Sequence, residues 1–129
     1  MSLVLILLSD TFTVYRLSAK AKIPESVLDS PFFNITRTAD ELSIVLPDTV
    51  KIQSALHESG WACFKVNGPL DFGLVGILSE ISSVLAKANV ALFAFSTYDT
   101  DYILVKQELA QTASDALMAA GFTIKRESS

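Results

Sequence analysis

WACFKVNGPLDFGLVGIL, residues 61–78, joins a strand pattern to a helix pattern and decides the fold of the chain. Residues 61–66 alternate in a way that is typical of a β-strand. Gly68 and Pro69 predict a turn, and Asp71 is a residue type that often caps a helix N-terminus. We therefore expect a strand, a turn and the start of a helix within this one stretch.

The expected helix extends beyond residue 78 with a single apolar stripe. The stripe follows the i, i+3, i+4, i+7 spacing of a helix that buries one face, and its members are Leu74, Ile77, Leu78, Ile81, Leu85 and Ala88. Asn89 tolerates the left-handed conformation that ends many helices. A strand over 91–95, a turn over 97–101 and a strand over 102–106 are expected to follow.

The last part of the chain predicts one more helix and one more strand. The helix is expected over 109–120 and the strand over 122–125, and the inward face of the helix is expected to hold Ala113, Ala116, Leu117 and Ala120. The order βαββαβ is that of the ferredoxin-like α+β fold. In such a unit we expect the 97–101 turn to lie at the opposite end of the sheet from the turn that precedes the first helix.

The first half of the chain repeats this pattern in a less regular form. Residues 33–45 resemble residues 93–105 at an offset of 60, and both segments predict strand, polar turn, strand. The remaining expected elements are strands at 3–7 and 12–17, a hairpin of 32–37 with 41–46, a short turn or helix around Pro24, and a helix over 49–59 with Ile52, Ala55 and Leu56 inward. We therefore expect two domains, 1–60 and 61–129, that share strand 61–66.

The composition excludes several classes of protein. The 129 residues are 50% hydrophobic and 19% charged with a net charge of −4, which is unlike a disordered chain. The longest early apolar run, 3–8, is far shorter than the roughly 20 residues that span a bilayer. The acidic balance gives no surface suited to nucleic acid or an anionic membrane. A single cysteine, Cys63, forms no internal disulfide and fits a cytoplasmic setting.

Few residues offer catalytic or metal-binding chemistry, so we expect no enzyme activity, no metal and no cofactor. His57 is the only histidine and is expected on the polar side of its helix, and Cys63 is expected to be a buried thiol. Asp99 and Asp101 could act as acid and base, bind an ammonium group, or only solvate a hairpin. The glycines near residue 73 precede a helix, whose free N–H groups attract anions, although turn and capping roles explain these residues more simply.

Two segments resemble a known family. Residues 76–81 (GILSEI) with 85–90 (LAKANV) look like the first helix and following strand of an ACT domain, although Val75 stands where proline is common. The combination of 36–43, 68–72 and 96–102 resembles the small bacterial tandem-ACT proteins related to the cytosolic arginine sensors of animals. This resemblance covers roughly residues 7–123 and implies tandem ferredoxin-like units with antiparallel sheets.

The resemblance implies a site for a free amino acid or a related small effector. The helix start would hold its carboxylate and Asp101 its ammonium group. Those sensors place an acidic residue about where Leu74 stands, so a smaller or more apolar amino acid fits at least as well. The implied ligand-binding residues are Gly68, Asp71, Phe72, Gly73, Leu74, Val75, Gly76, Ile77, Thr97, Tyr98 and Asp101.

Three hypotheses for function follow. The first is a non-enzymatic regulatory module that binds an amino acid, acts on a protein target and forms a homodimer. Part of the high apolar content of the chain would then lie on the dimer surface. The second is a protein-interaction module that docks on a partner without a ligand. The third is a small enzyme with Asp99 or Asp101 as general base, for which the chain offers little other machinery.

Overall fold

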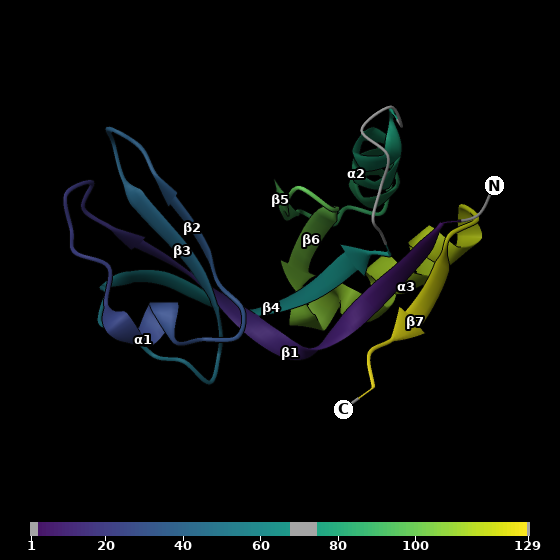
Figure 1. The fold of residues 1–129 in the computed structure, drawn as a ribbon. Helices are drawn as coiled ribbons and strands as arrows, with labels where there is room; N and C mark the ends of the chain where they lie inside the picture. The colour runs from purple at the N-terminus through teal and green to yellow at the C-terminus, as the bar shows by residue number, and fades with distance from the viewer. Residues whose placement is uncertain (1–2, 68–74, 129) are drawn as a thin grey trace. The chain divides into compact units, whose positions relative to one another are not determined.

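A computed structural model describes residues 3–67 and 75–128, and the chain forms two compact units. The inserted unit is Asp10–Trp61, and the discontinuous unit comprises residues 1–9 and 62–129. Two strands pass from one unit into the other (Figure 1), namely β1 (Val4–Leu17) and β4 (Leu56–Val66). The predicted division 1–60 and 61–129 therefore differs from the observed units in the placement of the first nine residues and of Trp61.

The discontinuous unit has the predicted βαββαβ order and the mixed α+β architecture of a ferredoxin-like fold. Its sheet runs in the order β7-β1-β4-β6-β5. The N-terminal strand β1 takes a place that the sequence patterns did not predict, between β4 and β7, and pairs parallel to β7. The elements after β4 are α2 (Ile77–Lys87), β5 (Phe93–Ser96), β6 (Asp101–Lys106), the 3-10 turn η1 (Gln107–Leu109), α3 (Ala110–Ala119) and β7 (Thr123–Arg126).

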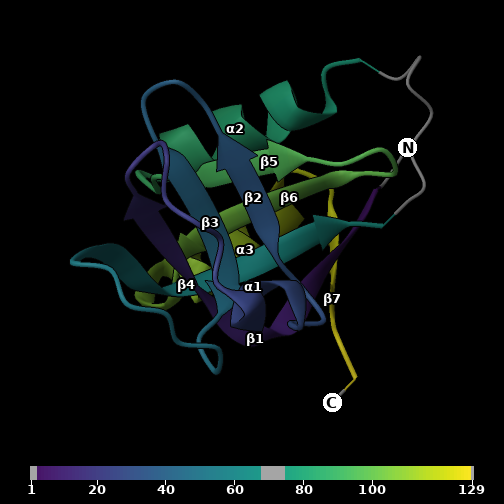
Figure 2. The same ribbon diagram turned by 60° about the vertical axis from the view of Figure 1, so that its left-hand side comes forward.

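One apolar core joins both helices of this unit to its strands. The strands β1, β4 and β6 contribute alternate side chains, and α2 and α3 cover that face, behind the strands in Figure 2. The alternation arises because successive strand residues face opposite sides of a sheet. Fully buried members of this core are Leu5, Phe64, Val66, Ile81, Leu85, Val105, Ala113 and Leu117.

The helices confirm most of the predicted inward faces. Ile81 and Leu85 are fully buried, and Asn89 ends α2 with a φ of 61°, as its residue type predicted. The prediction for α3 was wrong at one end, because Ala120 lies beyond the helix and is exposed, whereas Ser114 is buried. Within the described residues no helix is both long and apolar enough to cross a membrane.

The inserted unit has a core of its own. Its sheet runs β2-β3-β1, where β2 (Asn34–Arg37) and β3 (Leu42–Pro47) form the predicted antiparallel hairpin. The predicted short helix is α1 (Glu25–Leu28), which begins after Pro24. The buried members of this second core are Tyr15, Val27, Leu42, Ile44 and Leu46.

Two predictions in the first half were wrong. Strands 3–7 and 12–17 are one continuous strand, β1, although Ser9 and Asp10 are exposed in its middle. The helix expected over 49–59 does not form, because residues 51–54 carry no regular structure and β4 begins at Leu56. Val50 and Ile52 both pack on the second core, which is the two-residue spacing of an extended chain, and Leu56 is 58% exposed.

The two hairpins match at an offset of 59 residues, and the predicted offset of 60 was wrong. Arg37 pairs with Leu42 next to one turn, and Ser96 pairs with Asp101 next to the other. Because side chains alternate along a strand, a slip of one residue would place every matched side chain on the opposite face. Asp101 therefore corresponds to the buried Leu42. It does not correspond to Glu41, with which the sequence comparison at an offset of 60 had matched it.

Candidate functional site

The β5–β6 turn lies beside the end of β4. The Thr100 hydroxyl donates a hydrogen bond to the carbonyl oxygen of Val66, the last residue of β4, at 2.6 Å. The backbone N–H of the next residue, Asn67, donates to the Val4 carbonyl at 2.8 Å. The turn is thus fixed to the point where the chain leaves β4 toward α2.

This arrangement corrects the expectation that the two turns lie at opposite ends of the sheet. Strands β4 and β5 belong to one sheet and are joined by the crossover helix α2, so they run in the same direction. The end of β5 and the turn that follows it therefore come to the end of β4.

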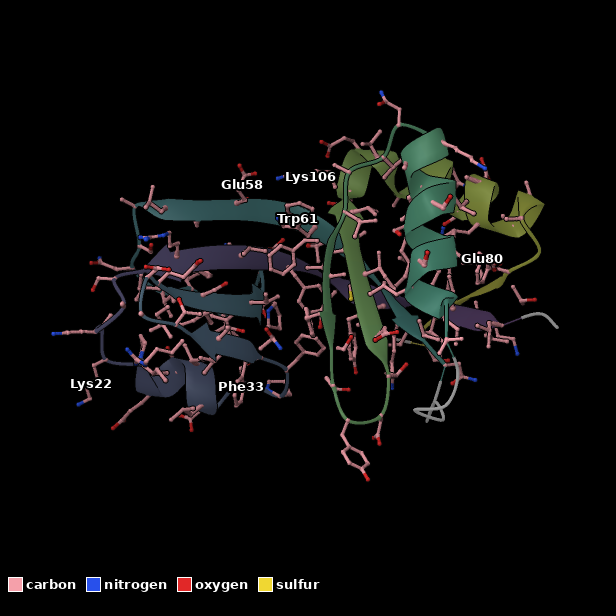
Figure 3. The ribbon with its side chains drawn as sticks, turned by 90° about the horizontal axis from the view of Figure 1, so that it is seen from above. Lys22, Phe33, Glu58, Trp61, Glu80 and Lys106 are labelled. Atoms are coloured by element: carbon pink, nitrogen blue, oxygen red, sulfur yellow. The ribbon has the colours of Figure 1, made fainter. Side chains whose placement is uncertain are left out.

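The first turn of α2 faces the same end of the unit (Figure 3). Gly76 precedes the helix with a φ of 83°, and no side chain caps the helix there. Helix N-termini present N–H groups that lack an intrahelical partner, together with the positive end of the macrodipole. Ile77 packs against the core, whereas Val75 is 89% exposed. The predicted site residues Gly68, Asp71, Phe72, Gly73 and Leu74 lie outside the described residues.

Hydrogen bonds between Thr97 and Thr100 hold the β5–β6 turn in one conformation. The Thr97 N–H donates to the Thr100 carbonyl at 2.8 Å, and the Thr100 N–H donates to the Thr97 hydroxyl at 3.3 Å. Thr100 is 4% exposed, so its bond to Val66 is shielded from water. Thr100 was not among the predicted site residues, and its place in a Thr-x-x-Thr turn is the sequence signal that could have identified it.

The side chains of the turn divide into an anchored group and an exposed group. The Asp101 carboxylate is half-buried and accepts a hydrogen bond from the Ser96 hydroxyl. Asp99 is exposed, and Tyr98 is 83% exposed. A carboxylate offers about four lone-pair directions, so Asp101 can accept further donors while it keeps its bond to Ser96.

Tyr102 follows the turn on β6, and the sequence analysis did not assign it to the site. Its ring stacks on Phe95 of β5, with centroids 5.1 Å apart and ring planes 16° from parallel. Burial raises the pKa of the Tyr102 phenol, and Cys63 and the Asp99 carboxylate add to this effect. Tyr102 is therefore a neutral phenol at physiological pH.

The reactive residue types lie away from this arrangement or are shielded. Burial, with a smaller contribution from the Glu127 carboxylate, raises the pKa of the Cys63 thiol to about 12. His57 belongs to β4 in the inserted unit, where its Nδ1 lies 2.9 Å from the Ser54 carbonyl, so its predicted position on a helix was wrong. Within residues 3–67 and 75–128, no group of three or more His, Cys, Asp or Glu side chains is placed to hold a metal ion.

Two family models match the chain. A model described as ACT domain matches residues 56–119, which include β4, α2, β5, β6 and α3. A second model, which describes an N-terminal domain, matches residues 10–50 and so falls within the inserted unit. The two matches divide the chain close to the boundary between the compact units.

Several solved structures resemble the whole chain. A crystal structure of an Agrobacterium tumefaciens protein is 34% identical with a TM-score of 0.91, and the match covers 100% of this chain and 96% of that one. A Vibrio cholerae protein of unknown function, described as a possible transport protein, is 22% identical with a TM-score of 0.71, over 92% of this chain and 89% of its own.

An aspartate kinase from Clostridium acetobutylicum, described as an allosteric enzyme, shares the fold at 15% identity and a TM-score of 0.68. The match covers 88% of this chain but only 33% of the kinase, so the likeness concerns about a third of that enzyme.

Proposed function

We propose that this chain, which belongs to the ACT domain family through residues 56–119, is a non-enzymatic regulatory module that binds a free amino acid or a related small effector. ACT domains are typically regulatory modules that bind small molecules. The effector would bind at the end of the discontinuous unit where β4 ends, α2 begins and the β5–β6 turn lies.

One observation carries this proposal, the hydrogen bond from Thr100 to the last residue of β4. It holds the Asp101 carboxylate at the end of the unit that also contains the N-terminus of α2. An amino acid carries an ammonium group and a carboxylate on one carbon. The Asp101 carboxylate is complementary to the ammonium group, and the N-terminus of α2 is complementary to the carboxylate. Asp101 would accept from the ammonium, and the α2 N-terminus would bind the carboxylate.

The finer parts of the proposal concern the effector, the assembly and the setting. We infer a relation to the small tandem-ACT proteins that resemble the cytosolic arginine sensors, with the inserted unit as the first, degenerate repeat. Leu74 stands where those sensors carry an acidic residue, which favours a small or apolar amino acid over arginine. A single, buried cysteine supports a cytoplasmic setting.

Regulation would operate through a shift between two populations. An effector that binds one arrangement of a homodimer more tightly than another displaces the equilibrium toward the first, and a protein target would respond to that arrangement. The mass measured by light scattering should be twice 14.0 kDa if the homodimer forms.

A thermal-shift screen of the twenty amino acids tests the proposal. At least one amino acid at millimolar concentration should raise the melting temperature, because a ligand that binds only the native state stabilises it. The Asp101→Asn variant should lose most of this shift. Asp99→Asn is the matched control, since it removes the same charge from an exposed position of the same turn. If no amino acid changes the melting temperature, the proposal is wrong.

A second candidate function, docking on a protein partner without an effector, is favoured by one observation. Val75 and Tyr98 are among the most exposed large side chains of the described residues, at 89% and 83%. Exposed apolar groups are common at interaction sites. Under this alternative a stoichiometric partner binds equally well with and without amino acids, and Asp101→Asn leaves that binding unchanged.

A further inference from the structure

The inserted unit contains a second turn with the same hydrogen bonds as the β5–β6 turn. The Thr38 N–H donates to the Glu41 carbonyl at 2.9 Å, and the Glu41 N–H donates to the Thr38 hydroxyl at 3.2 Å. Thr97 and Thr100 make the same two bonds at 2.8 and 3.3 Å. The local structure of the two turns is therefore equivalent, 59 residues apart.

The surroundings of the two turns are also equivalent. In the inserted unit Leu17, the last residue of β1, pairs with Leu42, the first residue of β3. The 38–41 turn therefore lies beside the end of β1, as the 97–100 turn lies beside the end of β4. In both units the next element along the chain after this strand is a helix, α1 after β1 and α2 after β4. The inserted unit thus has a counterpart of the proposed effector site.

In this counterpart, arginine side chains of the chain itself donate hydrogen bonds to backbone carbonyls. The Arg37 guanidinium donates to the carbonyl oxygens of Ala19 and Ala21, the latter at 2.8 Å. Both carbonyls belong to the loop between β1 and α1. The Arg16 guanidinium donates to the Asp40 carbonyl at 3.0 Å, within the 38–41 turn. Two guanidinium groups therefore tie the loop and the turn to neighbouring strands.

The features proposed to bind an amino acid are missing from the counterpart. By strand pairing, Arg37 occupies the position of Ser96 and Leu42 occupies the position of Asp101. Leu42 is fully buried and cannot accept from an ammonium group. Helix α1 has four residues against the eleven of α2, so its dipole is small.

We infer that the inserted unit is closed to effectors by its own Arg37 and Arg16, so that the chain binds one effector molecule, in the discontinuous unit. The statement about stoichiometry rests on the proposed function, whereas the closure itself rests only on the contacts of the two arginines. The inserted unit would then be a structural repeat whose arginine side chains substitute for a ligand.

Limited trypsin digestion of the full chain tests the closure. Lys20 and Lys22 lie in the loop that Arg37 holds, and both are exposed cleavage sites. Arg37→Ala should speed cleavage after these lysines several-fold, because loss of two hydrogen bonds raises the population of the open loop. Lys51→Ala, which removes another exposed cation of the same unit, should leave this rate unchanged.

Arg37→Lys keeps the charge but cannot donate to both carbonyls through one planar group, so its rate should fall between wild type and Arg37→Ala. An unchanged cleavage rate in Arg37→Ala contradicts the closure. Circular dichroism separates this local effect from loss of the fold, and if Arg37→Ala fails to fold, Arg37→Lys alone decides the question.

The stoichiometry is tested by native mass spectrometry with the amino acid found in the thermal-shift screen. One effector per chain is expected, with the same affinity in Arg37→Ala. Two effectors per wild-type chain, or loss of binding in Arg37→Ala, contradicts the inference. A chain that binds no amino acid contradicts the proposed function alone, and the trypsin result still decides whether the inserted unit is closed.

Discussion

Thr100 is the residue on which the geometry of the proposed site depends most. Its hydroxyl is buried and bonds a backbone carbonyl 34 positions away in the chain. A buried carbonyl that loses its donor costs free energy, since water cannot replace the bond. The side chain therefore stabilises both the turn and the end of β4.

Replacing Thr100 by valine tests this role with almost no change of shape. Thr100→Val should lower the free energy of unfolding by about 1–3 kcal/mol, because the Val66 carbonyl remains buried without its donor. Chemical denaturation measures the difference. Thr112→Val, at an exposed position of α3, is the control and should change stability by less than about 0.5 kcal/mol. Equal stability of the two variants would contradict the role of Thr100.

Cys63 predicts a specific dependence of stability on alkaline pH. Its pKa is about 12 in the folded chain against an ordinary thiol value of 9.0, so the unfolded chain loses this proton first. The stabilisation from the protonated thiol is therefore fully present below about pH 9 and is lost as the pH rises from about 9 toward 12. Cys63→Ala should show a smaller loss of stability over this range than wild type, and equal slopes would contradict the burial of the thiol.

At the residue scale the sequence could predict polar residues but not their partners. Thr97, Tyr98 and Asp101 were named through the resemblance to the ACT family, in a segment where turn-forming and acidic residue types cluster. Thr100 was missed because its importance comes from Val66, 34 positions away in the chain, and Tyr102 because its importance comes from the ring of Phe95 on the paired strand. Long-range hydrogen bonds and ring stacking leave no local periodicity.

At the scale of elements, the start of α2 is the feature that the site depends on. Gly76 has a φ of 83°, a conformation that L-residues with a Cβ rarely adopt. A Cβ at this position would meet no atom within 4 Å, so any cost of substitution comes from the backbone alone.

Gly76→Ala should therefore lower the free energy of unfolding by about 1–2 kcal/mol. Asn89→Gly, at the other end of α2, is the matched comparison, because Asn89 has a φ of 61° and glycine relieves the strain there. Thermal or urea unfolding should show opposite signs for the two variants. If Gly76→Ala is as stable as wild type, then Gly76 does not have the left-handed conformation.

The elements of the second half could be predicted from their apolar patterns. The stripe of α2 matches its burial at Ile81 and Leu85, whereas β4 and β6 are recognisable as short apolar runs, in which residues 62–64 and 103–105 are all buried. The segment 49–59 fails because Ile52 and Leu56 fit a helical spacing equally well, while Val50 and Ile52 pack as an extended chain on the inserted unit's core. Local pattern alone does not distinguish these cases when tertiary contacts decide.

For the whole molecule, the important feature is that β1 and β4 each contribute to both units. The sequence predicted that a strand would be shared, but it did not predict that β1 lies between β4 and β7. A pairing between the two ends of the chain depends on the folded sheet, since no local signal relates Val4 to Thr123.

Hydrogen bonds to a side chain also hold these two ends of the chain together, in addition to the pairing of β1 with β7. Both the N–H and the hydroxyl of Ser9 donate to the Glu127 carboxylate, at 2.8 and 3.0 Å. The residue that follows β7 is therefore bound to β1 next to the point where β1 enters the inserted unit. The proposed effector site lies in the same discontinuous unit as this contact.

Two-dimensional NMR of the labelled full chain, titrated with the amino acid from the screen, shows where that amino acid binds. If it binds at the end of the discontinuous unit formed by the β5–β6 turn and the start of α2, as we propose, the largest shift changes fall on Thr97–Asp101 and Val75–Ile77, while Thr38–Glu41 are unaffected. Changes that concentrate on Thr38–Glu41, or no changes at saturating amino acid, would contradict this proposal.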